Sequence, residues 1–189
     1  MIPDTRTSED TDVLMAGFGG QGTLLAGKVL AQASMEEGRE VSWLPSYGPE
    51  MRGGTANVIV CIASKPIGSP LIEHPRGLIA MNLPSLEKFG PKVKPGGVIV
   101  LNQSLIDRDP HRDDCVIINV PSRELAQQAG SVRAANFVML GAYVGATGAV
   151  SAEAIEHAIA EEFAGDREKF IPASIAAFRA GVEAVCPRS

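Results

Sequence analysis

A glycine-rich segment at residues 17–22, GFGGQG, constrains the fold more than any other feature of the sequence. It follows the short apolar run at residues 13–16 and precedes a stretch in which Leu25, Val29 and Ala33 recur at four-residue spacing. This order predicts a strand, a tight turn and a helix. Glycines at such a turn let a ligand approach the helix N-terminus, where free N–H groups favour a phosphate or carboxylate.

Two nucleotide-binding patterns overlap this turn, and neither is complete. The spacing matches G-x-G-x-x-G, but a dinucleotide site also needs an acidic residue at the end of the second strand. That strand, predicted at residues 40–44, runs into Pro45, and the next acidic residue is Glu50. The P-loop pattern at residues 22–28 is followed by Val29, which cannot ligate magnesium. A third interpretation is that the glycines only permit a sharp turn.

The middle of the chain alternates between further apolar runs and turns. Runs rich in aliphatic residues on both faces are typical of strands in a sheet that helices cover on both sides. We expect strands at residues 56–62, 78–81, 98–101 and 115–120, and a short helix at residues 83–89. Together with the first strand, helix and strand, these elements predict a three-layer α/β fold whose mostly parallel, Rossmann-like central sheet is flanked by helices.

The last third of the chain is predicted to be helical. Residues 135–150 are apolar and rich in alanine and glycine, and Gly141, Gly145 and Ala149 form one i, i+4 row that can pack unusually close to a neighbour. Ser151 is a good N-cap for a following helix. The inward positions expected in the last two helices are Ile155, Ala158, Ile159 and Phe163, and then Ile175, Phe178, Val182 and Val185.

Length and composition favour one domain, at residues 12–186, preceded by a polar leader at residues 1–11 that is expected to be disordered. The 189 residues are 45% hydrophobic and carry a net charge of -5, which argues against binding to nucleic acid phosphates. Neither a secretory signal nor an apolar run of ~18 residues is present, so we expect a cytoplasmic protein that does not insert into membranes.

Catalytic and metal-binding signatures are absent from the sequence. The three cysteines, Cys61, Cys115 and Cys186, lie more than 50 positions apart and lack zinc or iron–sulfur spacing. His157 lacks the second histidine of a helical zinc site, and a solvated histidine is the expected state. We therefore predict no catalytic residue and no metal ligand in this chain.

A polar loop at residues 46–54 follows the second predicted strand. In an open parallel sheet, ligands bind beyond the carboxyl ends of the strands, so this loop is expected beside the glycine turn. Arg52 can hold a carboxylate or phosphate in bidentate fashion, and Glu50 can orient it or contact a partner. The alternative is that Glu50 and Arg52 pair with each other on the surface, where an ion pair contributes little.

Taken together, the glycine turn, the segment from Leu44 to Asn57 and the sequence from Arg133 to Asn136 before an apolar helix resemble the gamma subunit of 2-oxoacid:ferredoxin oxidoreductases. The resemblance covers residues 12–148 and extends to the versions that handle 2-oxoglutarate, 2-ketoisovalerate or pyruvate. It implies oxidative decarboxylation of a 2-oxoacid to an acyl-coenzyme A and carbon dioxide, with electrons passed to ferredoxin. The isolated chain would be inactive.

The resemblance also implies a division of labour among subunits. Thiamine pyrophosphate with magnesium would lie in the alpha and beta subunits, and iron–sulfur clusters in a ferredoxin-like delta subunit or in other regions. This chain would contribute subunit packing and handling of coenzyme A. When isolated, the chain can be expected to form a homodimer. The alternative function is that of a stand-alone dinucleotide- or nucleotide-binding protein without catalytic partners. The candidate binding residues are Gly17, Gly19, Gly20, Gln21, Gly22, Ser46, Tyr47, Gly48, Glu50, Arg52, Gly53 and Asn136, the last of which can equally cap its helix.

Overall fold

The computed structural model describes residues 10–47 and 55–185, which form a six-stranded sheet with helices on both faces. The strand order is β2-β3-β1-β4-β5-β6. The strands are β1 (Thr11–Phe18), β2 (Glu40–Tyr47), β3 (Thr55–Ala63), β4 (Gly77–Ala80), β5 (Val98–Asn102) and β6 (Val116–Val120). Each predicted strand is present with ends shifted by one or two residues, apart from the longer extension of β2 to Tyr47.

The direction of β3 is the main departure from the expected topology. β1, β4, β5 and β6 pair in parallel, whereas β3 is antiparallel to both β1 and β2. The predicted strand-helix-strand unit is therefore interrupted, because β3 lies between β1 and β2. The sheet is still mostly parallel, as expected, with β2 running in the same direction as β1.

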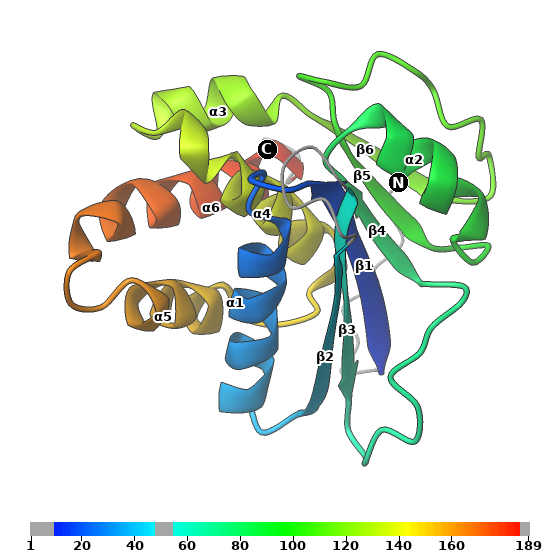
Figure 1. Ribbon diagram of the computed structural model, residues 1–189, viewed down its shortest axis with the longest axis horizontal. Helices are drawn as coiled ribbons and strands as arrows, with labels where there is room; N and C mark the ends of the chain where they lie inside the picture. Colours follow the sequence, from blue (N-terminus) through cyan, green and yellow to red (C-terminus); the bar gives the residue numbers. More distant parts are fainter. Residues whose placement is uncertain (1–9, 48–54, 186–189) are drawn as a thin grey trace.

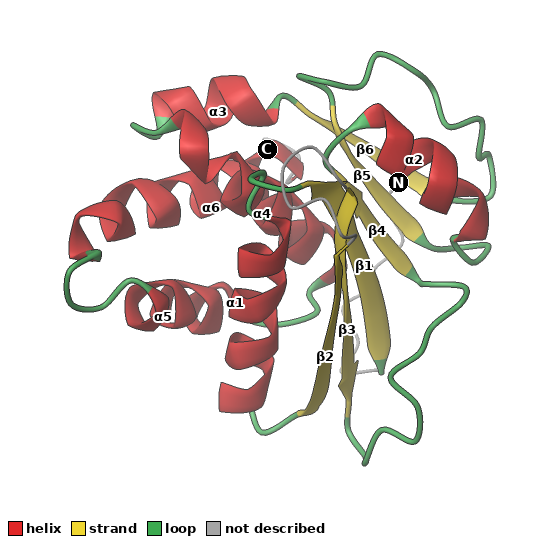
Figure 2. Cartoon of the chain, in the orientation of Figure 1, coloured by secondary structure: helices red, strands yellow, loops and turns green. Residues whose placement is uncertain are grey.

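The helices form two unequal layers around the sheet (Figure 1, Figure 2). Helix α2 packs on one face, and the other five α-helices lie on the opposite face. The α-helices are α1 (Thr23–Glu36), α2 (Leu83–Phe89), α3 (Ser122–Gln128), α4 (Ala135–Thr147), α5 (Ala152–Glu162) and α6 (Ile171–Val185), and the short 3-10 helices are η1 (Gly90–Lys92), η2 (Val132–Ala134) and η3 (Glu168–Phe170). Across the described ranges, none of these helices combines the length and apolarity that a membrane span requires.

Alternation along the strands divides the core between the two faces. Val13 and Met15 of β1 face the larger cluster beneath α1 and α4, whereas Leu14 and Ala16 face the smaller cluster beneath α2. This two-sided burial explains why the strand sequences are apolar almost throughout. Helix α4, with nine buried residues, is the central element of the larger layer.

The predicted glycine row allows α4 and α6 to approach at backbone distance. A Cβ atom placed on Gly141 would lie 2.0 Å from the carbonyl oxygen of Phe178, and one on Gly181 would lie 2.0 Å from the carbonyl oxygen of Val138. The expectation of unusually close packing is confirmed for Gly141. Ala149 lies beyond the last residue of α4, so the row ends within the helix.

Side-chain capping is present at the starts of α5 and α2, and the sequence predicted only the first of these caps. The Ser151 side chain accepts a hydrogen bond from the Ala154 N–H, which confirms the predicted N-cap of α5. Helix α2 has Asn82 as its N-cap. Helix α3 was not predicted, because only Ser122 and Ala126 of its residues are buried and its apolar periodicity is weak.

Candidate functional site

The glycine turn lies at the edge of the sheet where β1, β4 and β5 end. Gly20 and Gly22 have φ angles of 95° and 75°, in the left-handed region that favours glycine. Gly22 is the N-cap of α1, which has no side-chain cap among the described residues and no acidic residue in its first turn. Gly19 and Gly20 are exposed beside it. The helix dipole and backbone N–H groups at this end favour an anion.

Gly17 and Thr23 form the tightly packed base of the turn. A Cβ atom on Gly17 would lie 2.8 Å from Thr23 Oγ1 and 2.9 Å from Met81 Cβ, so a larger residue would force the turn away from β4. Thr23 is 3% exposed, and its hydroxyl has no hydrogen-bond partner within the described part of the chain. The base therefore contains a buried hydroxyl that none of the described residues satisfies.

Gln21 braces the turn instead of projecting freely from it. Its Oε1 accepts hydrogen bonds from the Phe18 N–H at 2.6 Å and from Asn82 Nδ2 at 3.0 Å. Its Nε2 donates to the Met81 carbonyl oxygen at 3.4 Å. Because both atoms of its amide are engaged, Gln21 positions the backbone of the glycine turn.

Asn136 connects the same turn to α4. It is 3% exposed, and its Nδ2 donates to the Gly22 carbonyl oxygen at 3.1 Å. The residue lies in the first turn of α4 and does not cap that helix, whose N-cap is Ala134. Asn136 therefore does not have the capping role that the sequence allowed. Its side chain instead connects α4 to the start of α1.

A chain of buried polar groups extends from the turn along the ends of β4 and β5. Ser122 donates to Asn102 Oδ1 at 2.7 Å, and Asn102 Nδ2 donates to the Met81 carbonyl oxygen at 3.1 Å, the same oxygen that Gln21 contacts. Asn82 caps α2 through the Ser85 N–H at 2.9 Å. Asn82, Asn102 and Ser122 are not among the site residues predicted from the sequence. Their common signal is a polar residue within two positions of the end of an apolar strand.

The second predicted loop begins and ends at this same edge. Tyr47 pairs with Ala56, and Ala56 pairs with Gly17, so the strands flanking residues 48–54 lie beside the glycine turn. The predicted site residues Gly48, Glu50, Arg52 and Gly53 fall outside the described residues. Ser46 is described, and it lines a cavity on the face of the sheet that carries α2.

The strand order is incompatible with a dinucleotide site of the Rossmann type. In such a site the acidic residue that binds ribose ends the strand adjacent to β1. Here the adjacent strand on that side is the antiparallel β3, and β2 lies one strand farther, about 10 Å from β1 at the usual strand spacing. The sequence lacks the acidic residue, and the sheet also lacks a parallel strand beside β1 on this side that could carry it.

Titratable groups in the described residues serve mainly structural contacts. His157 Nδ1 lies 2.9 Å from Glu36 Oε2, and the hydrogen bond and negative charge of Glu36 raise the pKa of His157. The histidine is exposed, as expected, but it is paired with α1 and does not stand alone. Cys61 is buried, and burial raises the pKa of its thiol. Cys115 is half-buried, and partial burial raises the pKa of its thiol as well.

Comparisons with known proteins agree with this architecture. The family model described as pyruvate ferredoxin/flavodoxin oxidoreductase matches residues 12–184. Ketoisovalerate oxidoreductase subunit VorA of Methanothermobacter marburgensis is 40% identical over 173 residues, which cover 90% of this chain and 36% of that protein. The chain therefore spans about a third of that relative's length.

Two solved structures share the fold. The gamma subunit of a keto/oxoacid ferredoxin oxidoreductase from Geobacter sulfurreducens is 30% identical with a TM-score of 0.78, covering 93% of this chain and 98% of that one. The 2-oxoglutarate:ferredoxin oxidoreductase from Magnetococcus marinus, with 2-oxoglutarate, coenzyme A and succinyl-CoA bound, is 24% identical with a TM-score of 0.84, covering 94% of this chain and 31% of that one.

Proposed function

Because this chain belongs to the pyruvate ferredoxin/flavodoxin oxidoreductase family, we propose that it is the gamma subunit of a cytoplasmic 2-oxoacid:ferredoxin oxidoreductase. The complex would oxidise a 2-oxoacid and coenzyme A to an acyl-coenzyme A and carbon dioxide. Two electrons per turnover would pass to ferredoxin. The family match over residues 12–184 is the observation that carries this proposal.

Within that complex, the proposed role of this chain is to bind part of an anionic ligand, with coenzyme A as the leading candidate. The start of α1 has backbone N–H groups and no side-chain cap among the described residues, and Gly19 and Gly20 just before it are exposed. Such an end favours phosphate groups. Coenzyme A is present in the Magnetococcus marinus relative, whose gamma-like region shares the fold described here.

The named residues divide into contacts and positioning groups. Arg52 is the proposed side-chain contact, because a guanidinium binds phosphate or carboxylate in bidentate fashion. Gln21 and Asn136 are positioning residues that hold the turn through Phe18, Asn82 and the Gly22 carbonyl. Thiamine pyrophosphate, magnesium and iron–sulfur clusters are assigned to alpha, beta and ferredoxin-like delta partners.

Anaerobic affinity purification of the tagged chain from its own organism tests the subunit role. We expect thiamine-binding and cluster-binding subunits to co-elute with dye reduction that depends on both coenzyme A and one of three 2-oxoacids, namely ketoisovalerate, 2-oxoglutarate or pyruvate. The isolated chain should show none of this activity. Recovery of a lone, inactive chain under conditions that preserve other complexes would contradict the proposal.

The ligand role needs a separate measurement on the purified complex. Arg52→Gln should raise KM for coenzyme A about tenfold or more, equivalent to about 1.4 kcal/mol, and leave KM for the 2-oxoacid unchanged. Arg123→Gln, at an exposed arginine on α3, is the matched control. Equal effects on both KM values, or no effect of either variant, would remove Arg52 from the coenzyme A site.

A further inference from the structure

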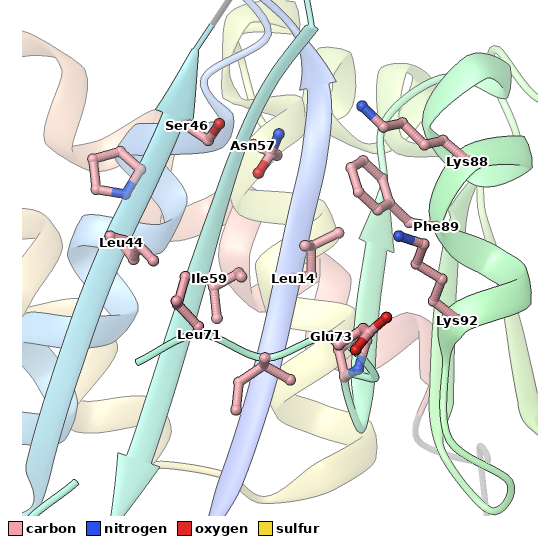
Figure 3. Close-up of a pocket in the computed structure, with 13 residues that line it drawn as sticks. Leu14, Leu44, Ser46, Asn57, Ile59, Leu71, Glu73, Lys88, Phe89 and Lys92 are labelled. Carbon is pink, nitrogen blue, oxygen red and sulfur yellow. The ribbon is translucent and has the colours of Figure 1, made fainter. Parts of the chain in front are cut away.

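The face of the sheet that carries α2 is only partly covered. Helix α2 packs on β1 and β4, and within the described residues no helix covers the neighbouring β2 and β3 on this side. A cavity of about 490 Å³ occupies this region (Figure 3). Its size is within the range of about 300–1,000 Å³ that is usual for small-molecule sites.

The floor of this cavity is apolar. Leu44, Ile59 and Leu14 come from the three adjacent strands β2, β3 and β1 and face into it. Leu71, from the connection between β3 and β4, forms part of the wall and is 73% exposed. Phe89, at the end of α2, closes the opposite wall. These side chains present an aliphatic and aromatic surface that a hydrocarbon body would cover favourably.

The rim of the cavity carries an excess of positive charge. Lys88 of α2 and Lys92 of η1 line it, and neither forms an ion pair with any described residue. Glu73 also lines the cavity, at the Lys92 end in the view of Figure 3, and the three charged side chains sum to +1 in a protein with net charge -5. Asn57, on the floor strand β3, adds an amide beside the Lys88 end.

From this arrangement we propose that the cavity is a binding site for a small amphipathic monocarboxylate. The carboxylate lies between the Lys88 and Lys92 ammonium groups, and the aliphatic body lies on Leu14 and Ile59. One negative charge matches the net rim charge of +1, whereas the phosphates of a nucleotide would also face Glu73. The site is separate from the glycine turn, because Leu14 and Ile59 belong to the smaller core cluster and face away from α1.

Octanoate binding to the full-length chain tests the proposal directly. Isothermal titration calorimetry should give saturable binding with one site per chain. Octanamide has the same hydrocarbon chain without the negative charge and should bind about fivefold or more weakly than octanoate. Acetate has the negative charge without the long hydrocarbon chain and should bind about tenfold or more weakly than octanoate. Amide chemical-shift changes should cluster at Leu14, Ile59 and Phe89.

Variants at exposed positions separate binding from folding. The double variant Lys88→Gln with Lys92→Gln should weaken octanoate binding about fivefold or more, whereas Arg123→Gln with Lys169→Gln makes the same change in net charge away from the cavity and should not. Leu71→Ser should weaken binding, and Leu105→Ser, at a residue that is 55% exposed, is its control. Absence of saturable octanoate binding, or equal affinity in both double variants at unchanged Tm, would overturn the proposal.

Discussion

Gly141→Ala should destabilise the protein even though alanine is the better helix former. In a helix interior the substitution alone would gain about 1 kcal/mol. In this structure the new Cβ would lie 2.0 Å from the Phe178 carbonyl oxygen and 3.0 Å from the Val182 nitrogen. The first distance is roughly 1.5 Å shorter than the ~3.5 Å contact that heavy atoms prefer. Both contacted atoms belong to the backbone, so relief requires α6 to move away from α4.

The expected magnitude follows from the balance of these two effects. Overpacking a well-packed core usually costs about 1–3 kcal/mol, and a backbone-to-backbone contact belongs at the upper end or beyond. After the propensity gain, we expect a net loss of about 2 kcal/mol and a decrease in Tm of roughly 4–8 °C. Urea denaturation and a thermal scan measure these quantities independently.

A matched variant in the same helix sharpens the test. Gly145→Ala places its Cβ 2.8 Å from Val185 Cγ2, a side-chain atom that can move, and 3.1 Å from the Val182 Cα. It should therefore be less destabilising than Gly141→Ala. A Gly141→Ala variant whose free energy of unfolding equals or exceeds that of the wild type would refute the close approach of α4 and α6.

The remaining predictions concern the glycine turn and one titratable pair. Gly22→Ala should lower the free energy of unfolding, measured by urea denaturation, by about 1–2 kcal/mol for the left-handed φ alone. The loss should be larger because the new Cβ would lie 2.7 Å from Asn136 Nδ2. Asn136→Ala should cost about 1–3 kcal/mol, and a double-mutant cycle with Gly22→Ala should be non-additive because the two residues touch. Since Glu36 raises the pKa of His157, the stabilisation from this pair is complete below the unfolded pKa of about 6.5 and is lost as pH rises through the higher folded pKa. The Tm difference between wild type and His157→Gln should shrink from about pH 5.5 to about pH 8.5, and a constant difference would exclude this linkage.

Much of the fold could be predicted because the strand sequences are apolar on both faces and the turns between them carry glycine or proline. The direction of β3 could not be predicted by that reasoning. Val58 and Val60 face one cluster and Ile59 the other, and this pattern fits a two-sided strand whether it runs parallel or antiparallel. Direction depends on which strands become neighbours, and that depends on contacts distant in sequence.

The site was predictable in outline for a similar reason. The glycines identified the turn, since their positive φ angles leave few other residue choices. The roles of Gln21 and Asn136 depend on the positions of Met81, Asn82 and the Gly22 carbonyl, which are fixed only after the helices pack. The cavity beside Lys88 was missed because its lining comes from strands and connections scattered between residues 14 and 92.

The antiparallel course of β3 also bears on how this protein can diversify. Because Tyr47 and Ala56 are directly paired, the two ends of the connection between β2 and β3 lie one strand spacing apart. Its length can therefore change without shifting the register of either strand or moving any helix. Relatives can thus differ by insertion, deletion or substitution at this one connection, while selection for a stable core acts on the rest of the chain.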